Sequence, residues 1–306
     1  MNKLIDQIIT EVGTVLLGKE QEIKLALTCL FSRGHLLIQD LPGMGKTTLS
    51  HALGHALGLD YKRIQFTSDM LPADILGVSI FDQQNGQFEF HQGPVFTQLL
   101  LADEINRTTP KTQSALLEAM EEKQVTIEGE TRKLDENFFV IATQNPVAQA
   151  GTFPLPESQL DRFLMRISLG YPNPQAEREL FMGLNPREKM ASIQPCLTLD
   201  ELQKIQQAAQ QVFISEAVLD YVQAVVKYTR THSEFAYGVS PRGALALVHC
   251  AKTWAFIDGR NHVLPEDVQT VMLPVLNHRV RDVADYGDTS GQALVERVLN
   301  AVDVVG

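Results

Sequence analysis

A glycine-rich turn that joins a short apolar run to a helical pattern is the feature that most restricts how this chain can fold. The apolar run covers residues 35–39, a helix is expected over 47–57, and the turn reads Asp40-Leu41-Pro42-Gly43-Met44-Gly45-Lys46-Thr47-Thr48. A strand followed by such a turn and a helix opens a parallel α/β unit. The turn therefore predicts an α/β fold with this strand inside a parallel sheet.

The same turn predicts a phosphate-binding loop. Gly43 and Gly45 let the backbone curl so that its N–H groups face phosphate oxygens, and the N-terminus of the next helix favours anions. Lys46 supplies a positive charge to the β- and γ-phosphates, and the Thr47 hydroxyl is placed to bind Mg²⁺. We therefore expect a nucleoside triphosphate with Mg²⁺, first of all ATP, to bind over residues 40–48.

One position of this loop departs from the usual pattern GxxxxGK[S/T]. Asp40 stands where the first glycine is expected. An aspartate lacks the freedom of glycine at positive φ, although it tolerates such positions better than most residues. We expect nucleotide binding to survive this change.

Two carboxylates follow a second apolar strand, which is expected over residues 98–102. They are Asp103 and Glu104. A phosphate-loop enzyme needs one carboxylate near Mg²⁺ and another near the water that attacks the γ-phosphate. Asp103 is the expected Mg²⁺ ligand, and Glu104 is the expected general base.

Three further polar residues are candidates for the same site. Asn145 follows the strand expected over 138–143 and could hold the water and sense the γ-phosphate, but an Asn-Pro pair also starts turns, and spacing does not decide between the two. Arg162 and Arg242 could each stabilise transition-state charge. Nothing in the residues around them distinguishes either arginine from a solvated surface group.

The order of apolar segments predicts two domains. Strands expected over 63–66, 98–102, 138–143 and 164–167 join the run at 35–39 in one sheet, and from residue 175 onward the pattern is helical. We therefore predict an α/β core over 1–171 and a helical domain over 172–306.

Two β-hairpins are predicted as insertions into the core. The first pairs residues 78–82 with 87–90 around Asn85-Gly86, and the second pairs 124–127 with 131–134 around Glu128-Gly129.

Composition narrows the classes of partner. The net charge of −11 and the lack of any Lys/Arg run argue against nucleic acid and anionic membranes as partners. The three cysteines are far apart, which argues against a disulfide framework. No signal peptide and no apolar stretch of about 20 residues is visible, so a cytoplasmic location without a membrane span is expected.

Together these segments resemble the AAA+ ATPases, and more narrowly the MoxR family. The residues that carry the resemblance run through most of the chain: 40–47, 65–67, 71–77, 93–96, 101–107, 142–146, 154–157, 160–163 and 240–243. An aspartate at the first position of the phosphate loop is also common in that family. The resemblance implies a five-stranded parallel sheet in the order 5-1-4-3-2 with a C-terminal helical lid.

The resemblance also implies roles for single residues. Asn145 would be the sensor next to the γ-phosphate, and Arg242 would touch the γ-phosphate of its own subunit. Arg162 would act as an arginine finger on the ATP of the neighbouring subunit, with Arg166 as the alternative for that finger. Gly18 would border the adenine, and the two hairpins would face the central channel of a ring.

Three functions are consistent with these features. The first is an ATP-hydrolysing, chaperone-like remodelling factor that forms a hexameric ring, for which the resemblance adds a von Willebrand A-type partner protein. The second is a nucleic-acid motor, which the acidic charge disfavours. The third is a nucleotide-gated binding protein with little turnover, because intact motifs do not set a hydrolysis rate.

Overall fold

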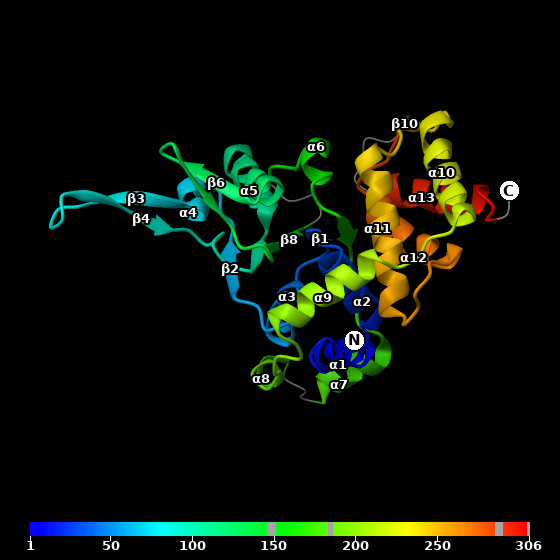
Figure 1. Cartoon of the computed structure of the whole chain (residues 1–306), viewed down its shortest axis with the longest axis horizontal. Helices are drawn as coiled ribbons and strands as arrows, with labels where there is room; N and C mark the ends of the chain where they lie inside the picture. The colour runs from blue at the N-terminus through cyan, green and yellow to red at the C-terminus, as the bar shows by residue number, and fades with distance from the viewer. Residues whose placement is uncertain (146–150, 183–185, 285–289, 305–306) are drawn as a thin grey trace.

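A five-stranded parallel sheet forms the centre of the computed structural model, which describes residues 1–145, 151–182, 186–284 and 290–304 (Figure 1). The strands lie in the order β2 (Tyr61–Gln65), β5 (Leu99–Asp103), β8 (Phe139–Gln144), β1 (Leu36–Gln39) and β9 (Met165–Ile167). When the five strands are numbered along the chain and the sheet is read from β9 to β2, the order is 5-1-4-3-2. This order confirms the predicted topology.

Both faces of the sheet are covered, and its central strands are apolar along most of their length. Leu36, Leu99 and Ile141 face a cluster that contains α1 (Asn2–Gly13), α2 (Glu20–Phe31) and α3 (Lys46–Ala56). Their neighbours in the sequence, Leu37, Leu100 and Val140, face a second cluster on the other side of the sheet. This cluster contains α4 (Pro72–Leu76) and α5 (Pro110–Glu122). This period-2 division explains why the sequence shows continuous apolar runs rather than alternation.

The two predicted hairpins are present. β3 (Gly77–Asp82) pairs with β4 (Gln87–Gln92), and the resulting ribbon projects far from the sheet (Figure 1). β6 (Gln124–Ile127) pairs with β7 (Glu130–Lys133) through a two-residue turn in which Glu128 and Gly129 have φ of 54° and 84°, the signs of a type I′ turn.

The second half of the chain is mainly helical. Its helices are α7 (Pro174–Phe181), α8 (Pro186–Met190), α9 (Leu199–Gln210), α10 (Glu216–Thr231), α11 (Pro241–Ile257), α12 (Pro265–Leu276) and α13 (Ser290–Ala301). The hydroxyls of Thr198, Ser215 and Ser240 accept hydrogen bonds from backbone N–H groups in the first turns of α9, α10 and α11. N-caps therefore stabilise the starts of these three helices.

The expectation that this half contains no strands is wrong in one place. β10 (Phe235–Tyr237) and β11 (Arg281–Asp282) form a short antiparallel ladder. Strands of three and two residues are too short for a period-2 pattern to be visible in the sequence.

The boundary near residue 172 stays a prediction. α8 contacts α3 of the core, and α9 contacts both α2 and α11. No helix in the described ranges is long and apolar enough to cross a membrane, and the three cysteines are free thiols.

Candidate nucleotide-binding site

The phosphate loop leaves β1 and enters α3 through two glycines in the left-handed region. Gly43 has φ of 85°, and Gly45, the N-cap of α3, has φ of 92°. A Cβ added to Gly43 would meet no atom within 4 Å. Glycine is therefore required there by the backbone conformation, not by lack of space. α3 begins at Lys46, so its first N–H groups point into the loop.

Asp40 does not need the backbone freedom that the sequence pattern suggested. The non-glycine residues at positive φ in the described part of the chain are Arg33, Glu104, Lys123 and Glu128. The expectation that Asp40 replaces a positive-φ glycine is therefore wrong. Its carboxylate is buried and turns toward the residues that follow β9.

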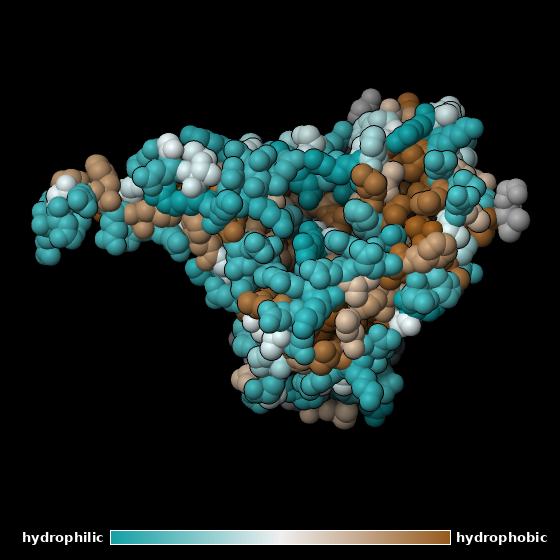
Figure 2. All heavy atoms as spheres, viewed as in Figure 1, coloured by the Kyte–Doolittle hydropathy of each residue, from teal (hydrophilic) through white to brown (hydrophobic). Residues whose placement is uncertain are grey.

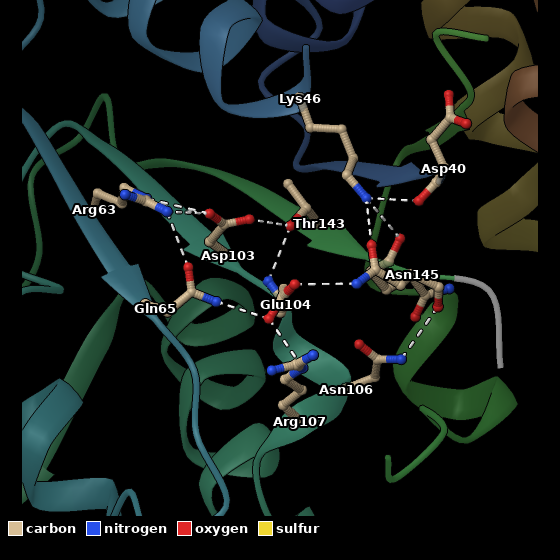
Figure 3. Close-up of polar contacts among 11 residues, drawn as sticks. Asp40, Lys46, Arg63, Gln65, Asp103, Glu104, Asn106, Arg107, Thr143 and Asn145 are labelled. Atoms are coloured by element: carbon tan, nitrogen blue, oxygen red, sulfur yellow. Dashed lines mark hydrogen bonds and ion pairs between the residues drawn. The ribbon is translucent and has the colours of Figure 1, made fainter. Parts of the chain in front are cut away.

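The side chain of Lys46 points toward Asp40 and Asn145 in Figure 3. Its ammonium donates to the backbone carbonyl of Asp40 at 2.6 Å and to Oδ1 of Asn145 at 2.8 Å. Burial lowers the pKa of Lys46, while the carboxylates of Asp40, Asp103 and Glu104 act in the opposite direction. The three nearby negative charges favour the charged form of the lysine, which is the form that binds phosphate.

Asp103 ends β5 and directs one oxygen at the loop. Oδ2 lies 3.4 Å from the Thr47 hydroxyl, and Oδ1 accepts a hydrogen bond of 2.6 Å from Thr143. From the neighbouring strand β2, Arg63 donates to the same Oδ2 at 2.7 Å. A carboxylate and a hydroxyl facing each other fit Mg²⁺, which takes one or two protein oxygens together with phosphate oxygens and water.

No cluster of three or more His, Cys, Asp or Glu side chains is found in the described ranges. The pair of Thr47 and Asp103 suits an ion that arrives with a nucleotide.

Glu104 follows Asp103 in an unusual backbone conformation. Its φ of 57° and ψ of 49° place it in the left-handed region, which costs about 1 kcal/mol or more for such a residue. Its carboxylate accepts from Asn145 at 3.1 Å and from Gln65 at 2.9 Å, and it pairs with Arg107 at 3.0 Å. The strained turn points the carboxylate toward the residue expected to sense the γ-phosphate.

Sequence reasoning assigned no individual role to Arg63, Gln65 or Thr143. Gln65 pairs in register with Asp103 across β2 and β5, and Arg63 lies two residues earlier on the same face. The predicted strand order already places the ends of these two strands side by side. That order is the signal that could have found these residues.

Arg162 and Arg242 meet at one carboxylate. Arg162 pairs with Oε2 of Glu121 at 3.0 Å and Arg242 with Oε1 at 2.7 Å. Among the described contacts, neither arginine bonds to Lys46, Asp103 or Glu104. The structure thus brings the two arginines together, but apart from the Lys46 group.

Arg166 has a different environment. Its guanidinium is buried and donates to Oδ1 and the backbone carbonyl of Asn277, at 3.1 and 3.0 Å, and to Gln39. These contacts fasten β9 to the end of α12. The role of Arg166 as the alternative arginine finger stays a prediction.

Gly18 connects the N-terminal helices to α7. It has φ of 68°, and a Cβ there would lie 2.5 Å from the amide nitrogen of Asn173, the N-cap of α7. A cavity of about 380 Å³ lies beside Gly18, with Gly13, Leu16 and Lys19 among its lining residues. The role of Gly18 next to the adenine stays a prediction.

Comparison with known proteins agrees with this geometry. Residues 35–165 match the "ATPase family associated with various cellular activities (AAA)", and residues 227–298 match the AAA lid domain. A crystal structure of a protein from Cytophaga hutchinsonii, provisionally described as an ATPase, superposes with a TM-score of 0.87 at 39% identity and covers 99% of this chain and 95% of that one. The sheet order, the loop and the helical second half define an α/β AAA+ ATPase fold with a lid.

Relatives of known sequence define the family more narrowly. Uncharacterized protein YeaC of Bacillus subtilis (strain 168) is 40% identical over 99% of this chain and 96% of its own length. Chaperone MoxR1 of Mycobacterium tuberculosis is 38% identical over 97% of this chain and 80% of its own length. Protein MoxR of Paracoccus denitrificans is 31% identical over 94% of this chain and 91% of its own length. The chain belongs to the MoxR family of AAA+ ATPases.

Proposed function

We propose that this protein binds ATP with Mg²⁺ and hydrolyses it. The observation that carries the proposal is the position of Asn145, which accepts a hydrogen bond from Lys46 and donates one to Glu104. A phosphate-binding lysine and a carboxylate base are thus joined through one amide at the carboxyl ends of neighbouring strands. Ligands of open α/β sheets bind at that edge.

Each polar group has one task in this reaction. Lys46 leaves its backbone acceptors to bind the β- and γ-phosphates, and Thr47 and Asp103 provide the oxygens that would hold Mg²⁺. An ion held by these oxygens would supply positive charge that neutralises the phosphates. Glu104 takes a proton from the attacking water, and Asn145 orients the carboxylate for that step.

Glu104 must exchange partners before it can act. Its Oε2 is engaged by both Gln65 and Arg107. A water that approaches this oxygen competes with both donors. We propose that nucleotide binding loosens these contacts and that the carboxylate is held inactive without nucleotide.

We further propose that the active enzyme is a ring, with six subunits as the expected number. Arg162 is proposed to act as a finger on the neighbouring subunit's ATP. The support for this role is that Arg162 pairs with Glu121 and, among the described contacts, makes none with the phosphate loop of its own chain. We propose that Arg242 acts together with Arg162, because both arginines pair with the carboxylate of Glu121.

The biological role that we propose is chaperone-like remodelling of partner proteins. Its support is membership of the MoxR family, in which the relative from M. tuberculosis is named a chaperone. A von Willebrand A-type protein is the partner class that we propose to test first. The exposed hairpin side chains Ile80, Phe81 and Phe88 offer an apolar surface on the projecting ribbon. Figure 2 shows hydrophobic residues in brown toward the end of that ribbon.

The deciding experiment is ATP turnover as a function of protein concentration for the wild type and Glu104→Gln. We expect turnover to rise with assembly in the wild type and to fall about 100-fold or more in the variant. Exposed Glu118 on α5 offers a matched control as Glu118→Gln, which should behave as the wild type. Equal turnover in wild type and Glu104→Gln would rule out Glu104 as the base.

The fully engaged carboxylate of Glu104 favours a second candidate function. A protein whose base stays bound to Gln65 and Arg107 would bind nucleotide and barely turn it over. Nucleotide-dependent binding of a partner, with negligible hydrolysis by the assembled wild type, would support that function instead.

A further inference from the structure

We propose that Asp40 is a positioning residue that links the phosphate loop to the segment 168–171, through which the sheet leads into α7. The proposal rests on nucleotide binding at the loop, as proposed above. It assigns the aspartate a task separate from phosphate binding. A glycine at the same place could not perform this task.

The carboxylate of Asp40 accepts four hydrogen bonds. Oδ2 accepts from the backbone N–H of Leu169 and of Gly170, both at 2.7 Å, and from the hydroxyl of Ser168 at 3.0 Å. Oδ1 accepts from the backbone N–H of Leu41 at 2.8 Å. The three donors to Oδ2 are the residues directly after β9. Hydrogen bonds to an ionised acceptor are among the stronger ones in proteins.

An amide could not replace this carboxylate. All four contacts require an acceptor, and asparagine has one acceptor oxygen and one donor group. If the oxygen of an asparagine faced Leu169 and Gly170, its NH₂ group would face the N–H of Leu41. The chemistry of the contacts therefore calls for an acid at position 40.

The same segment is held from its other side by Lys19. The ammonium of Lys19 donates to the backbone carbonyls of Leu169 and of Tyr171, the latter at 2.8 Å. Gly18, the preceding residue, packs against the N-cap of α7. Residues 168–171 are thus hydrogen-bonded both to Asp40 of the phosphate loop and to Lys19 of the N-terminal region.

The backbone of Asp40 touches the catalytic lysine. Its carbonyl accepts a hydrogen bond of 2.6 Å from the ammonium of Lys46. When a bound phosphate draws the Lys46 ammonium away, the carbonyl of Asp40 loses this hydrogen bond. The side chain of the same Asp40 binds the backbone of Leu169 and Gly170. Phosphate occupancy and the start of the helical half of the chain are therefore connected through one residue.

The experiment measures hydrogen–deuterium exchange of residues 168–171 in the full chain, with and without ADP and Mg²⁺. In the wild type we expect ADP to change the exchange of the Leu169 and Gly170 amides. In Asp40→Asn these amides should exchange about tenfold faster without nucleotide, and the ADP-dependent change should be lost. The affinity for a fluorescent ADP should change by less than about threefold, since Lys46 and the loop backbone remain.

Two further variants and one control define the role. Asp40→Gly restores the commoner loop residue, so it should bind ADP and also lose the response at 168–171, even if Asp40→Asn fails to fold. Ser168→Ala removes one of three donors to Oδ2 and should give a smaller increase in exchange. Asp135→Asn, which replaces an exposed acid that accepts from the N–H of Asn137, should match the wild type.

The outcomes separate the two proposals. A wild type that binds no ADP would defeat the nucleotide site, while faster exchange in Asp40→Asn would still show the attachment. A full ADP response at 168–171 in a folded Asp40→Gly would overturn the linking role. Loss of ADP affinity in both Asp40 variants would overturn it as well, because Asp40 would then be a binding residue.

Discussion

The side-chain amide of Asn145 donates a hydrogen bond to Oε1 of Glu104 over 3.1 Å. The oxygen of the same amide accepts from Lys46 at 2.8 Å, so the two ends of Asn145 are used by groups of opposite charge. Because β8 is buried along its whole length, its last residues have little freedom. Asn145 is therefore a fixed connection between the proposed phosphate-binding cation and the proposed base.

The first prediction concerns this connection. Asn145→Ala should lower ATP turnover by about 10- to 100-fold, because the carboxylate loses the donor that orients it. Affinity for ADP should change much less, since Lys46 and the loop are intact. Steady-state turnover and ADP titration would measure both effects. Asn137→Ala, before the other end of β8, is the control, and similar turnover in the two variants would contradict the prediction.

A second prediction concerns Arg63 and magnesium. Arg63 pairs with the Asp103 oxygen that faces Thr47, so Mg²⁺ must displace it. The Arg63 side chain is about half exposed, so the effect of Arg63→Gln is expected to be modest: half-maximal binding of fluorescent ADP at about two- to fivefold less Mg²⁺. Exposed Arg178 gives the matched control Arg178→Gln. A Mg²⁺ requirement that rises in Arg63→Gln would show that the arginine helps the ion instead of competing with it.

The fold could be predicted because each of its signals is local. The apolar runs before Asp40 and Asp103, and the glycines of the loop, are contiguous in the sequence and require no tertiary information. The strand order came from family resemblance and agrees with the observed sheet. The ladder of β10 and β11 could not be predicted, because it joins residues more than 40 positions apart through very short strands.

The site was predictable to a lesser extent. Lys46, Asp103 and Asn145 converge as expected, since parallel strands end at one edge. The task of the Asp40 carboxylate depends on where β9 ends, and the meeting of Arg162 with Arg242 depends on where the start of α11 lies relative to Glu121. Both are long-range consequences of packing, which no short motif records.

A third prediction tests whether Arg162 acts between subunits. Arg162→Ala and Glu104→Gln should each be inactive alone. Mixed in equal amounts and allowed to exchange subunits, they should recover activity at about a quarter of the interfaces, where an intact site meets an intact finger. Two inactive variants of Glu104, mixed in the same way, are the control. No recovery would mean that Arg162 serves its own subunit.

The fourth prediction separates two roles for Arg242. If Arg242 acts with Arg162, as their shared contact with Glu121 suggests, a mixture of Arg242→Ala and Glu104→Gln should recover activity to a similar extent. If Arg242 touches the γ-phosphate of its own subunit, as family resemblance implies, this mixture should stay inactive. The same turnover assay measures both outcomes.

The last prediction concerns pH and stability. His35 lies buried at the start of β1, where its Nδ1 accepts from the N–H of Val140 at 3.0 Å and its Nε2 faces the carbonyl of Met120 at 3.2 Å. These contacts suit the neutral ring with its proton on Nε2. Burial is the main reason that the pKa of His35 falls from 6.5 to about 4.

A lowered pKa in the folded state means that the unfolded chain binds the proton first as pH falls. The stabilisation that neutral His35 gives to the folded state is therefore complete above pH 6.5 and is lost progressively down to about pH 4. The free energy of unfolding should fall by about 3 kcal/mol over this range. Denaturant unfolding between pH 7 and pH 4 should show this slope in the wild type and in the exposed control His91→Gln. In His35→Gln the protein should be less stable at pH 7, because the N–H of Val140 loses its acceptor, but it should lose less stability on acidification. A slope as steep as that of the wild type in His35→Gln would assign the acid sensitivity to other groups.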